Sequence, residues 1–126
     1  MRKFVAVAVL AVSSFIASAQ VKPVHHAGDW WDARTAEYKL AYLSGYKSAL
    51  HHQIGHDTPL SPFSSYVMRA GVDKFYKDFR NRNLVIDDAI SYVGKQLSGA
   101  TNADLEHDLL AMRAAAAKVG SAEDDE

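Results

Sequence analysis

The chain has 126 residues and no cysteine, and its 14 Lys and Arg residues nearly balance its 15 Asp and Glu residues, for a formal net charge of −1. A chain of this length forms one domain, and the missing cysteine excludes disulfides, thiol chemistry and a lipidated cysteine. A near-neutral chain has no strong basic field, which argues against nucleic acid or an anionic membrane as its partner.

The N-terminal segment has the pattern of a secretory signal peptide. Arg2 and Lys3 form a basic start, residues 4–16 form an apolar run, and residues 17–19 read Ala-Ser-Ala. The run is too short to span a bilayer comfortably. We therefore expect cleavage after Ala19, no stable membrane anchor, and a periplasmic or secreted protein. Losing the two basic residues leaves 12 basic against 15 acidic side chains, a balance near −3.

The next segment is expected to be a flexible leader over residues 20–28, followed by a long helix over residues 30–54 with Asp29 as its cap. This helix is apolar on two sides: Trp31, Tyr38, Tyr42, Gly45 and Ala49 on one, Leu40, Leu43, Leu50 and Ile54 on the other. A helix of this kind is usually covered on both sides, so it is either central or lends one face to a partner. Gly45 costs about 1 kcal/mol relative to alanine in mid-helix. It marks either a close approach of another backbone or a tolerated surface glycine.

Three further helices are predicted beyond the loop at residues 55–62. The second runs from a Ser64 or Ser65 cap to about Arg80. The third has Asp87 as its cap and runs to Leu97, and the fourth begins at Thr101 or Asn102. In the fourth helix one stripe is apolar: Leu105, Leu109, Met112 and Ala116. The sequence thus predicts an all-α fold, a compact bundle of about four helices over residues 29–119, with an acidic disordered tail at residues 120–126.

Two aromatic residues of the first helix are candidates for a partner surface. Trp30 and Tyr46 lie off the predicted core stripe, and aromatic side chains with polar tips are favoured at protein interfaces. The loop that follows contributes Asp57 and Phe63 to the candidate set. We assign the other aromatic residues of this helix, Trp31, Tyr38 and Tyr42, to the core.

A histidine cluster at the end of the first helix is the candidate metal site. His51, His52 and His56 lie beside Asp57, with His25 and His26 in the leader as further ligands. A spacing of four on one helix face can hold a transition metal, which makes a periplasmic metal-binding protein the alternative function. The other interpretation is that these histidines favour the negative end of the helix dipole. We favour this second interpretation, because Gly55 and Pro59 indicate that the helix ends here.

Catalytic signatures are not found in the sequence. Ser61, Ser64 and Ser65 are not part of a nucleophile elbow, and there is no glycine loop for phosphate. The carboxylate pairs at residues 87–88 and 104–106 come at predicted helix starts, where acids favour the dipole. We therefore expect a non-enzymatic protein without a cofactor.

Three segments resemble a known family. Residues 38–46 (YKLAYLSGY) form an aromatic-small-Gly-aromatic stretch, residues 71–76 (GVDKFY) lie in the next helix, and residues 87–97 follow after a turn. In order and layout these segments resemble the Rap/Tai immunity proteins of type VI secretion over about residues 30–97. The resemblance implies a non-enzymatic periplasmic binder, often a dimer, that plugs the active-site cleft of a peptidoglycan-cleaving amidase.

The chain also departs from that family. Its members commonly carry a cysteine in the loop, another near the end, and a proline after the second helix. Here there is no cysteine, and Asn-Arg-Asn stands at residues 81–83. The departures leave a related group of small exported helical proteins as the alternative, and no inhibitory residue of the family can be carried over to this chain.

Overall fold

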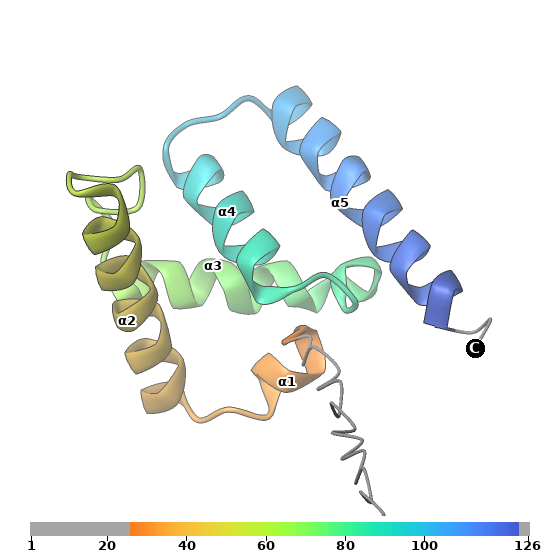
Figure 1. The fold of residues 1–126 in the computed structure, drawn as a ribbon, viewed down its shortest axis with the longest axis horizontal. Coiled ribbons are helices and arrows are strands. Elements are labelled where there is room, and N and C mark those ends of the chain that lie inside the picture. Colours follow the sequence, from red (N-terminus) through yellow and green to blue (C-terminus); the bar gives the residue numbers. More distant parts are fainter. Residues whose placement is uncertain (1–25, 124–126) are drawn as a thin grey trace, which may run out of the picture.

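The computed structural model describes residues 26–123, with side chains up to residue 120. The elements in chain order are α1 (Gly28–Asp32), α2 (Ala36–Ile54), α3 (Ser65–Lys77), the 3-10 helix η1 (Phe79–Asn81), α4 (Ile86–Leu97) and α5 (Asn102–Glu123). No strand occurs in this part of the chain, so the predicted all-α fold is confirmed. Figure 1 shows α3 crossing behind α4, with α2 and α5 on either side.

The predicted first helix is broken into two. Thr35 has an extended backbone (ψ 162°), and its hydroxyl accepts a hydrogen bond from the amide of Tyr38, which makes it the N-cap of α2. Asp29 is not a cap, because α1 already begins at Gly28 and its N-cap, Ala27, makes no side-chain bond. The break lets Trp31 turn into the core, where it is fully buried.

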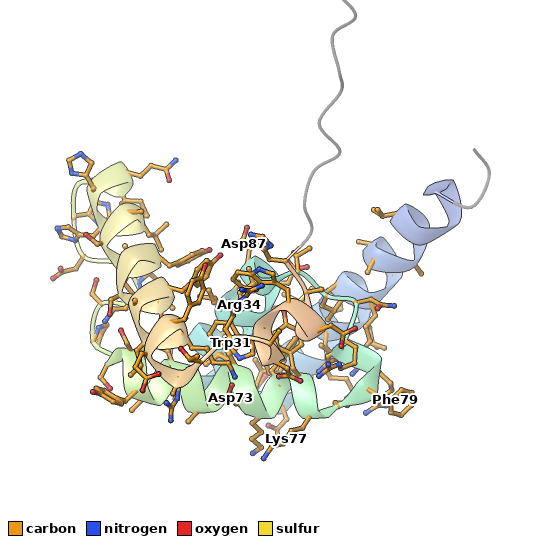
Figure 2. The ribbon with its side chains drawn as sticks, turned by 90° about the horizontal axis from the view of Figure 1, so that it is seen from below. Trp31, Arg34, Asp73, Lys77, Phe79 and Asp87 are labelled. Carbon is orange, nitrogen blue, oxygen red and sulfur yellow. The ribbon has the colours of Figure 1, made fainter. Side chains whose placement is uncertain are left out.

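Trp31 is also held by a polar contact beneath α1 (Figure 2). Its Nε1 donates to the carboxylate of Asp73 on α3 at 2.7 Å, and Lys39 Nζ donates to the same oxygen at 2.9 Å. The ammonium group lies 5.1 Å from the centre of the Trp31 ring. A buried indole N–H needs such a partner, so this contact fixes α1 against α3.

The core lies where α3 and α4 cross. It is built from the buried side chains of Trp31, Leu43, Leu60, Met68, Val72, Phe75, Tyr76, Leu84, Ile86, Ala89, Ile90 and Val93. A Cβ on Gly71 would meet Val93 Cγ1 at 2.5 Å, so this glycine allows α3 and α4 to pack closely. The buried Tyr76 hydroxyl donates a hydrogen bond to the carbonyl oxygen of Leu84 at 2.8 Å.

Several predicted helix ends are confirmed, and others shift. Ser64 caps α3, and the Thr101 hydroxyl accepts from the amide of Asp104 at the start of α5. The second helix stops at Lys77 rather than Arg80, because Asp78 turns extended and starts η1. Asp87 lies in the first turn of α4 and is not its cap, since Val85 holds that position.

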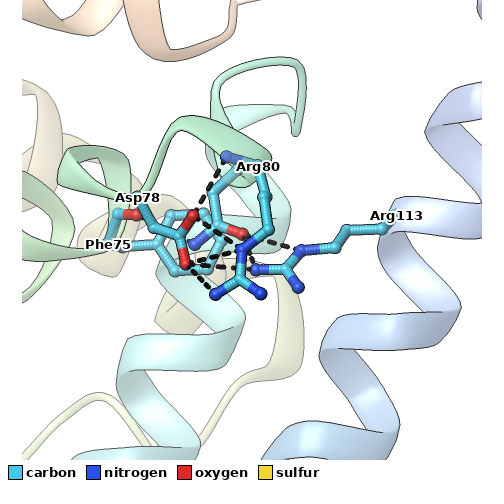
Figure 3. Close-up of polar contacts among 5 residues, drawn as sticks. Phe75, Asp78, Arg80 and Arg113 are labelled. Atoms are coloured by element: carbon cyan, nitrogen blue, oxygen red, sulfur yellow. Dashed lines mark hydrogen bonds and ion pairs between the residues drawn. The ribbon is translucent and has the colours of Figure 1, made fainter.

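The long C-terminal helix α5 packs against α4. Leu105 is buried, and Leu109, Met112 and Ala116 pack against the core cluster, as their predicted stripe requires. Arg113 adds a polar link, because its guanidinium donates twice to Asn81 Oδ1, at 2.7 and 3.0 Å (Figure 3). The helix continues to Glu123, past the point where we expected the tail to begin.

The expected signal peptide and most of the expected leader lie outside the described residues. Within residues 26–123 no helix has both the length and the apolar character needed to cross a membrane. Residues 26–28, which we expected to belong to the leader, are held by backbone bonds from Ile86 N to His26 O (2.7 Å) and from Gly28 N to Arg82 O (3.0 Å).

Candidate functional site

Four aromatic side chains from α1 and α2 form a continuous row, which we call the aromatic row: Trp30, Tyr38, Tyr42 and Tyr46. The Trp30 ring lies 6.1 Å from Tyr38 and 5.3 Å from Tyr42, edge to face in both cases. Tyr42 and Tyr46 follow at 6.5 Å. The three tyrosines share one face of α2 because they are four residues apart, and the break at Thr35 brings Trp30 back against them.

A guanidinium and an imidazole extend this row. The Arg34 guanidinium carbon lies 5.1 Å from the centre of the Trp30 ring and 5.5 Å from that of Tyr38, within the range of a cation–π contact. On the same indole, His26 stacks at 4.0 Å with an interplanar angle of 11°. Arg34 Nε and His26 Nδ1 are buried and have no hydrogen-bond partner among residues 26–123.

Two carboxylates at the start of α4, Asp87 and Asp88, influence the pKa values of tyrosines in the aromatic row. Burial raises the pKa of the Tyr42 and Tyr46 hydroxyls, and the charge of Asp87 raises both further. Both phenols therefore keep their protons at neutral pH and can donate hydrogen bonds. Burial, and then Asp87, also raise the pKa of Asp88. Neither carboxylate has an ion-pair partner in the described part of the chain.

An apolar groove continues from Tyr46 between α2 and α4, and we call it the α2–α4 groove. Its volume is about 290 Å³. The lining residues are Tyr46, Leu50, Pro59, Leu60, Ile90, Ser91, Gly94, Lys95 and Ser98. A Cβ on Gly94 would collide with Leu60, so the glycine allows the loop after α2 to close the end of the groove. The aromatic row and the groove together form one surface of rings, aliphatic side chains and phenol donors.

The structure brings together only part of the predicted partner-binding set. Trp30 and Tyr46 are half-buried and belong to the same row through Tyr42. Asp57 lies on the loop, its side chain 92% exposed, with Oδ1 3.8 Å from His51 Nδ1. Phe63 packs against the core cluster, and its carbonyl accepts a hydrogen bond from Lys47. The ring contacts of the described residues do not include Phe63.

The assignment of the tyrosines to the core is wrong for Tyr38, which is 47% exposed, and only half right for Tyr42, which is half-buried. The signal for the row was present in the sequence as the four-residue spacing of the tyrosines. Arg34 and Asp87 had no such signal, because their positions beside the row depend on the break after α1 and on where α4 begins.

The histidines lie at the other end of α2. His51, His52 and His56 are all exposed, and His56 Nδ1 lies 2.8 Å from the Asp57 carbonyl oxygen. Gly55 ends the helix in the left-handed conformation (φ 78°), so the four-residue spacing of His52 and His56 does not place both on one helix face. Among the described residues no group of three or more His, Asp or Glu side chains could hold a metal ion.

Comparison with known proteins identifies no relative of this chain. Neither a protein-family model, nor a curated protein, nor a solved structure matches the chain.

Proposed function

We propose that this chain is a non-enzymatic, exported helical module that binds another protein through the aromatic row and the α2–α4 groove. The observation that carries the proposal is the aromatic row itself. Trp30 contacts both Tyr38 and Tyr42, and Tyr42 contacts Tyr46, so the four rings form one row. Tyr38 nevertheless keeps about half of its surface in solvent, and the other three rings are only half-buried. Aromatic residues on the surface of a rigid element are the anchors that dominate protein interfaces.

The more specific form of this proposal is an immunity protein that inhibits a peptidoglycan-cleaving effector. It is supported by the signal-peptide pattern of residues 1–19, by the small size of the chain and by the resemblance of residues 38–46 to the Rap/Tai proteins, since three of the row's rings belong to that segment. In such a role, side chains of the module would fill or cover the substrate cleft of the hydrolase. A homodimer is part of this form of the proposal.

The test is an affinity capture with matched variants. The chain from residue 20 onward is immobilised, exposed to cell-envelope extract of the producing cells and neighbouring strains, and the retained proteins are identified by mass spectrometry. We expect one stoichiometric partner, whose Kd rises at least about tenfold with Tyr38→Ala or Tyr46→Ala, because truncating a central anchor costs about 2 kcal/mol or more and each 1.4 kcal/mol is about tenfold in Kd.

Phe79→Ala serves as the control, since Phe79 is 80% exposed but lies at the edge of the molecule away from α2 (Figure 2). Its Kd should equal that of the unchanged chain. If no partner is retained, or if all three variants bind alike, the proposed surface is wrong. If the partner is a hydrolase, adding the chain should block its release of peptides from purified peptidoglycan, and unaltered release would overturn the immunity role.

A further inference from the structure

Arg34 differs from the other arginines of residues 26–123 because it has no carboxylate partner. The other four, Arg69, Arg80, Arg82 and Arg113, each form an ion pair with an aspartate. The guanidinium of Arg34 makes no ion pair and no hydrogen bond within the described part of the chain. Its Nε is buried without a partner, while its Nη1 and Nη2 atoms are accessible to solvent.

Two aromatic rings hold this guanidinium in place at one end of the aromatic row. Its central carbon lies 5.1 Å from the centre of the Trp30 ring and 5.5 Å from the centre of the Tyr38 ring. A guanidinium that rests on rings keeps its in-plane N–H groups for hydrogen bonds, and their fork matches the two oxygens of a carboxylate. The hydroxyl of Tyr38 has no hydrogen-bond partner among residues 26–123 either, so it is a further donor beside Arg34.

The chain does not supply the missing anion. Residues 1–25 contain no Asp or Glu. The acidic residues 123–126 lie at and beyond the C-terminal end of α5, which is across the molecule from α2 (Figure 1). Asp87, the carboxylate that acts on the row, makes no ion pair with Arg34. An anion that pairs with Arg34 therefore has to come from another molecule.

We propose that Arg34 is a carboxylate-binding site at the Trp30–Tyr38 end of the aromatic row, and that it receives an Asp or Glu side chain of the bound protein. The Arg34 fork would donate two hydrogen bonds to this carboxylate, and the Tyr38 hydroxyl would donate a third. The inference rests on the proposed function for its occupant and deepens it, because it names the chemistry that the partner presents.

The two ends of the aromatic row differ in charge. Arg34 lies at one end, whereas burial and then the charge of Asp87 raise the pKa of Tyr42 and Tyr46 at the other. Tyr38 and Tyr46 are eight residues apart on α2, which is about 12 Å. A carboxylate of the partner is thus attracted to one end and repelled at the other, which fixes the orientation of binding. Asp87 also favours a carboxylate, with one negative charge, over a phosphate with nearly two.

The first measurement uses acetate as the probe and needs no partner. The nitrogen-15-labelled chain from residue 20 onward is titrated with sodium acetate at neutral pH and constant ionic strength, and followed by NMR. We expect saturating shifts of the Arg34 Nε–H and Trp30 indole N–H signals, with half-saturation at about 10–100 mM, as the strength of charged hydrogen bonds implies. Arg34→Gln should abolish the saturating shift of the Trp30 signal. The control is Arg80→Gln, which should leave it unchanged, because Arg80 pairs with Asp78 at the surface.

The second measurement uses the partner obtained by affinity capture. Arg34→Gln should raise the Kd of this complex at least about tenfold, because it leaves a partner carboxylate without its counter-charge. The Kd of the unchanged chain should also rise more steeply with salt than the Kd of Arg34→Gln, since salt screens the ion pair that the variant lacks. A merely structural role of Arg34 would not change the salt dependence. Arg80→Gln should behave like the unchanged chain.

The outcomes separate this site from the proposed function. No saturating shift with acetate would overturn the site, whether or not a partner is captured. Saturation by inorganic phosphate at a lower concentration than acetate would assign Arg34 to phosphate and overturn the carboxylate. Acetate binding combined with an unchanged partner Kd for Arg34→Gln would overturn the assignment to the partner. If the capture retains no protein, acetate alone decides the site, and the acidic side chain as its occupant fails together with the proposed function.

Discussion

At the scale of single residues, the glycines show most clearly what a sequence can and cannot predict. Gly45 is costly in mid-helix, and close approach of another backbone was one of two explanations for it. The structure supports the other explanation, since a Cβ there would meet no atom within 4 Å. The close approach occurs instead at Gly71, against Val93. Both glycines lie inside helices, and only the packing of α3 on α4 distinguishes them.

This difference gives a matched pair of predictions. Gly45→Ala should stabilise the protein by about 0.5–1 kcal/mol, because it restores helix propensity without a clash. Gly71→Ala should destabilise it by about 1–3 kcal/mol, because the new methyl group meets the stiff, buried side chain of Val93. Urea denaturation of both variants measures the two free energies of unfolding.

A control for the Gly71 effect is the double variant with Val93→Ala, which removes the clashing methyl groups. The added cost of Gly71→Ala should be smaller in that background than in the unchanged chain. Equal costs in both backgrounds would show that helix propensity, and not the contact with Val93, sets the stability.

At the scale of elements, the sequence predicts the helices better than their breaks. The apolar pattern of residues 30–54 fits one continuous helix, and no glycine or proline interrupts its first turns. The structure nevertheless breaks the chain before Ala36, because burial of Trp31 and its bond to Asp73 act over 42 residues of sequence. Local periodicity contains no information about such a contact, so the position of Trp30 beside the tyrosines could not be predicted.

One buried polar side chain, Asn81, adds a hydrogen-bonded link to the apolar packing of α5. Asn81 is 4% exposed, its amide donates to the carbonyl of Phe75 at 2.9 Å, and its oxygen accepts both bonds from Arg113 (Figure 3). Arg80 lies beside this pair, and its guanidinium bonds to the carboxylate of Asp78 at the surface. Removing the Arg113 side chain leaves the buried Asn81 Oδ1 without its hydrogen-bond donor. Removing the Arg80 side chain uncovers the Asp78 carboxylate, which water can reach.

We therefore expect Arg113→Ala to cost about 1–3 kcal/mol in the free energy of unfolding and Arg80→Ala to cost clearly less. Hydrogen exchange locates the effect: amides of α5 should lose protection in Arg113→Ala, while those of α3 should change less. Equal loss over the whole chain would contradict the role of Arg113 as a local attachment of α5.

At the scale of the whole molecule, the sequence predicts the class of fold and the order of the helices. It does so because α3 and α4 carry clear apolar stripes and because Ser64 and Thr101 mark helix starts with side-chain caps. The relative placement of the helices depends on contacts between distant residues, and the candidate surface depends on that placement. Trp30 and Tyr46 could thus be selected one by one from the sequence, whereas the row that joins them could not.

The acid stability of the molecule follows from the carboxylates that pair with their neighbours. Hydrogen bonds from Arg80 lower the pKa of Asp78 from 3.8 to about 2, and a hydrogen bond from Lys95 lowers the pKa of Asp108. A carboxylate whose pKa is lower in the folded state stabilises that state fully above its unfolded pKa, near 4. This contribution is lost as the pH falls from about 4 toward 2. Asp88 has the opposite effect on stability, because its pKa is raised in the folded state. Its charge destabilises the folded state, and this cost decreases as the pH falls.

Asp78 and Asp108 both lie at the attachment of α5, Asp78 beside Arg113 and Asp108 on the helix itself. We therefore expect the free energy of unfolding to fall between pH 4 and pH 2, with α5 the first helix to lose its hydrogen-exchange protection. Urea titrations at each pH measure the fall, and it should be smaller for Asp78→Asn, which has no proton to gain. If that variant follows the same pH curve as the unchanged chain, other carboxylates control the acid transition.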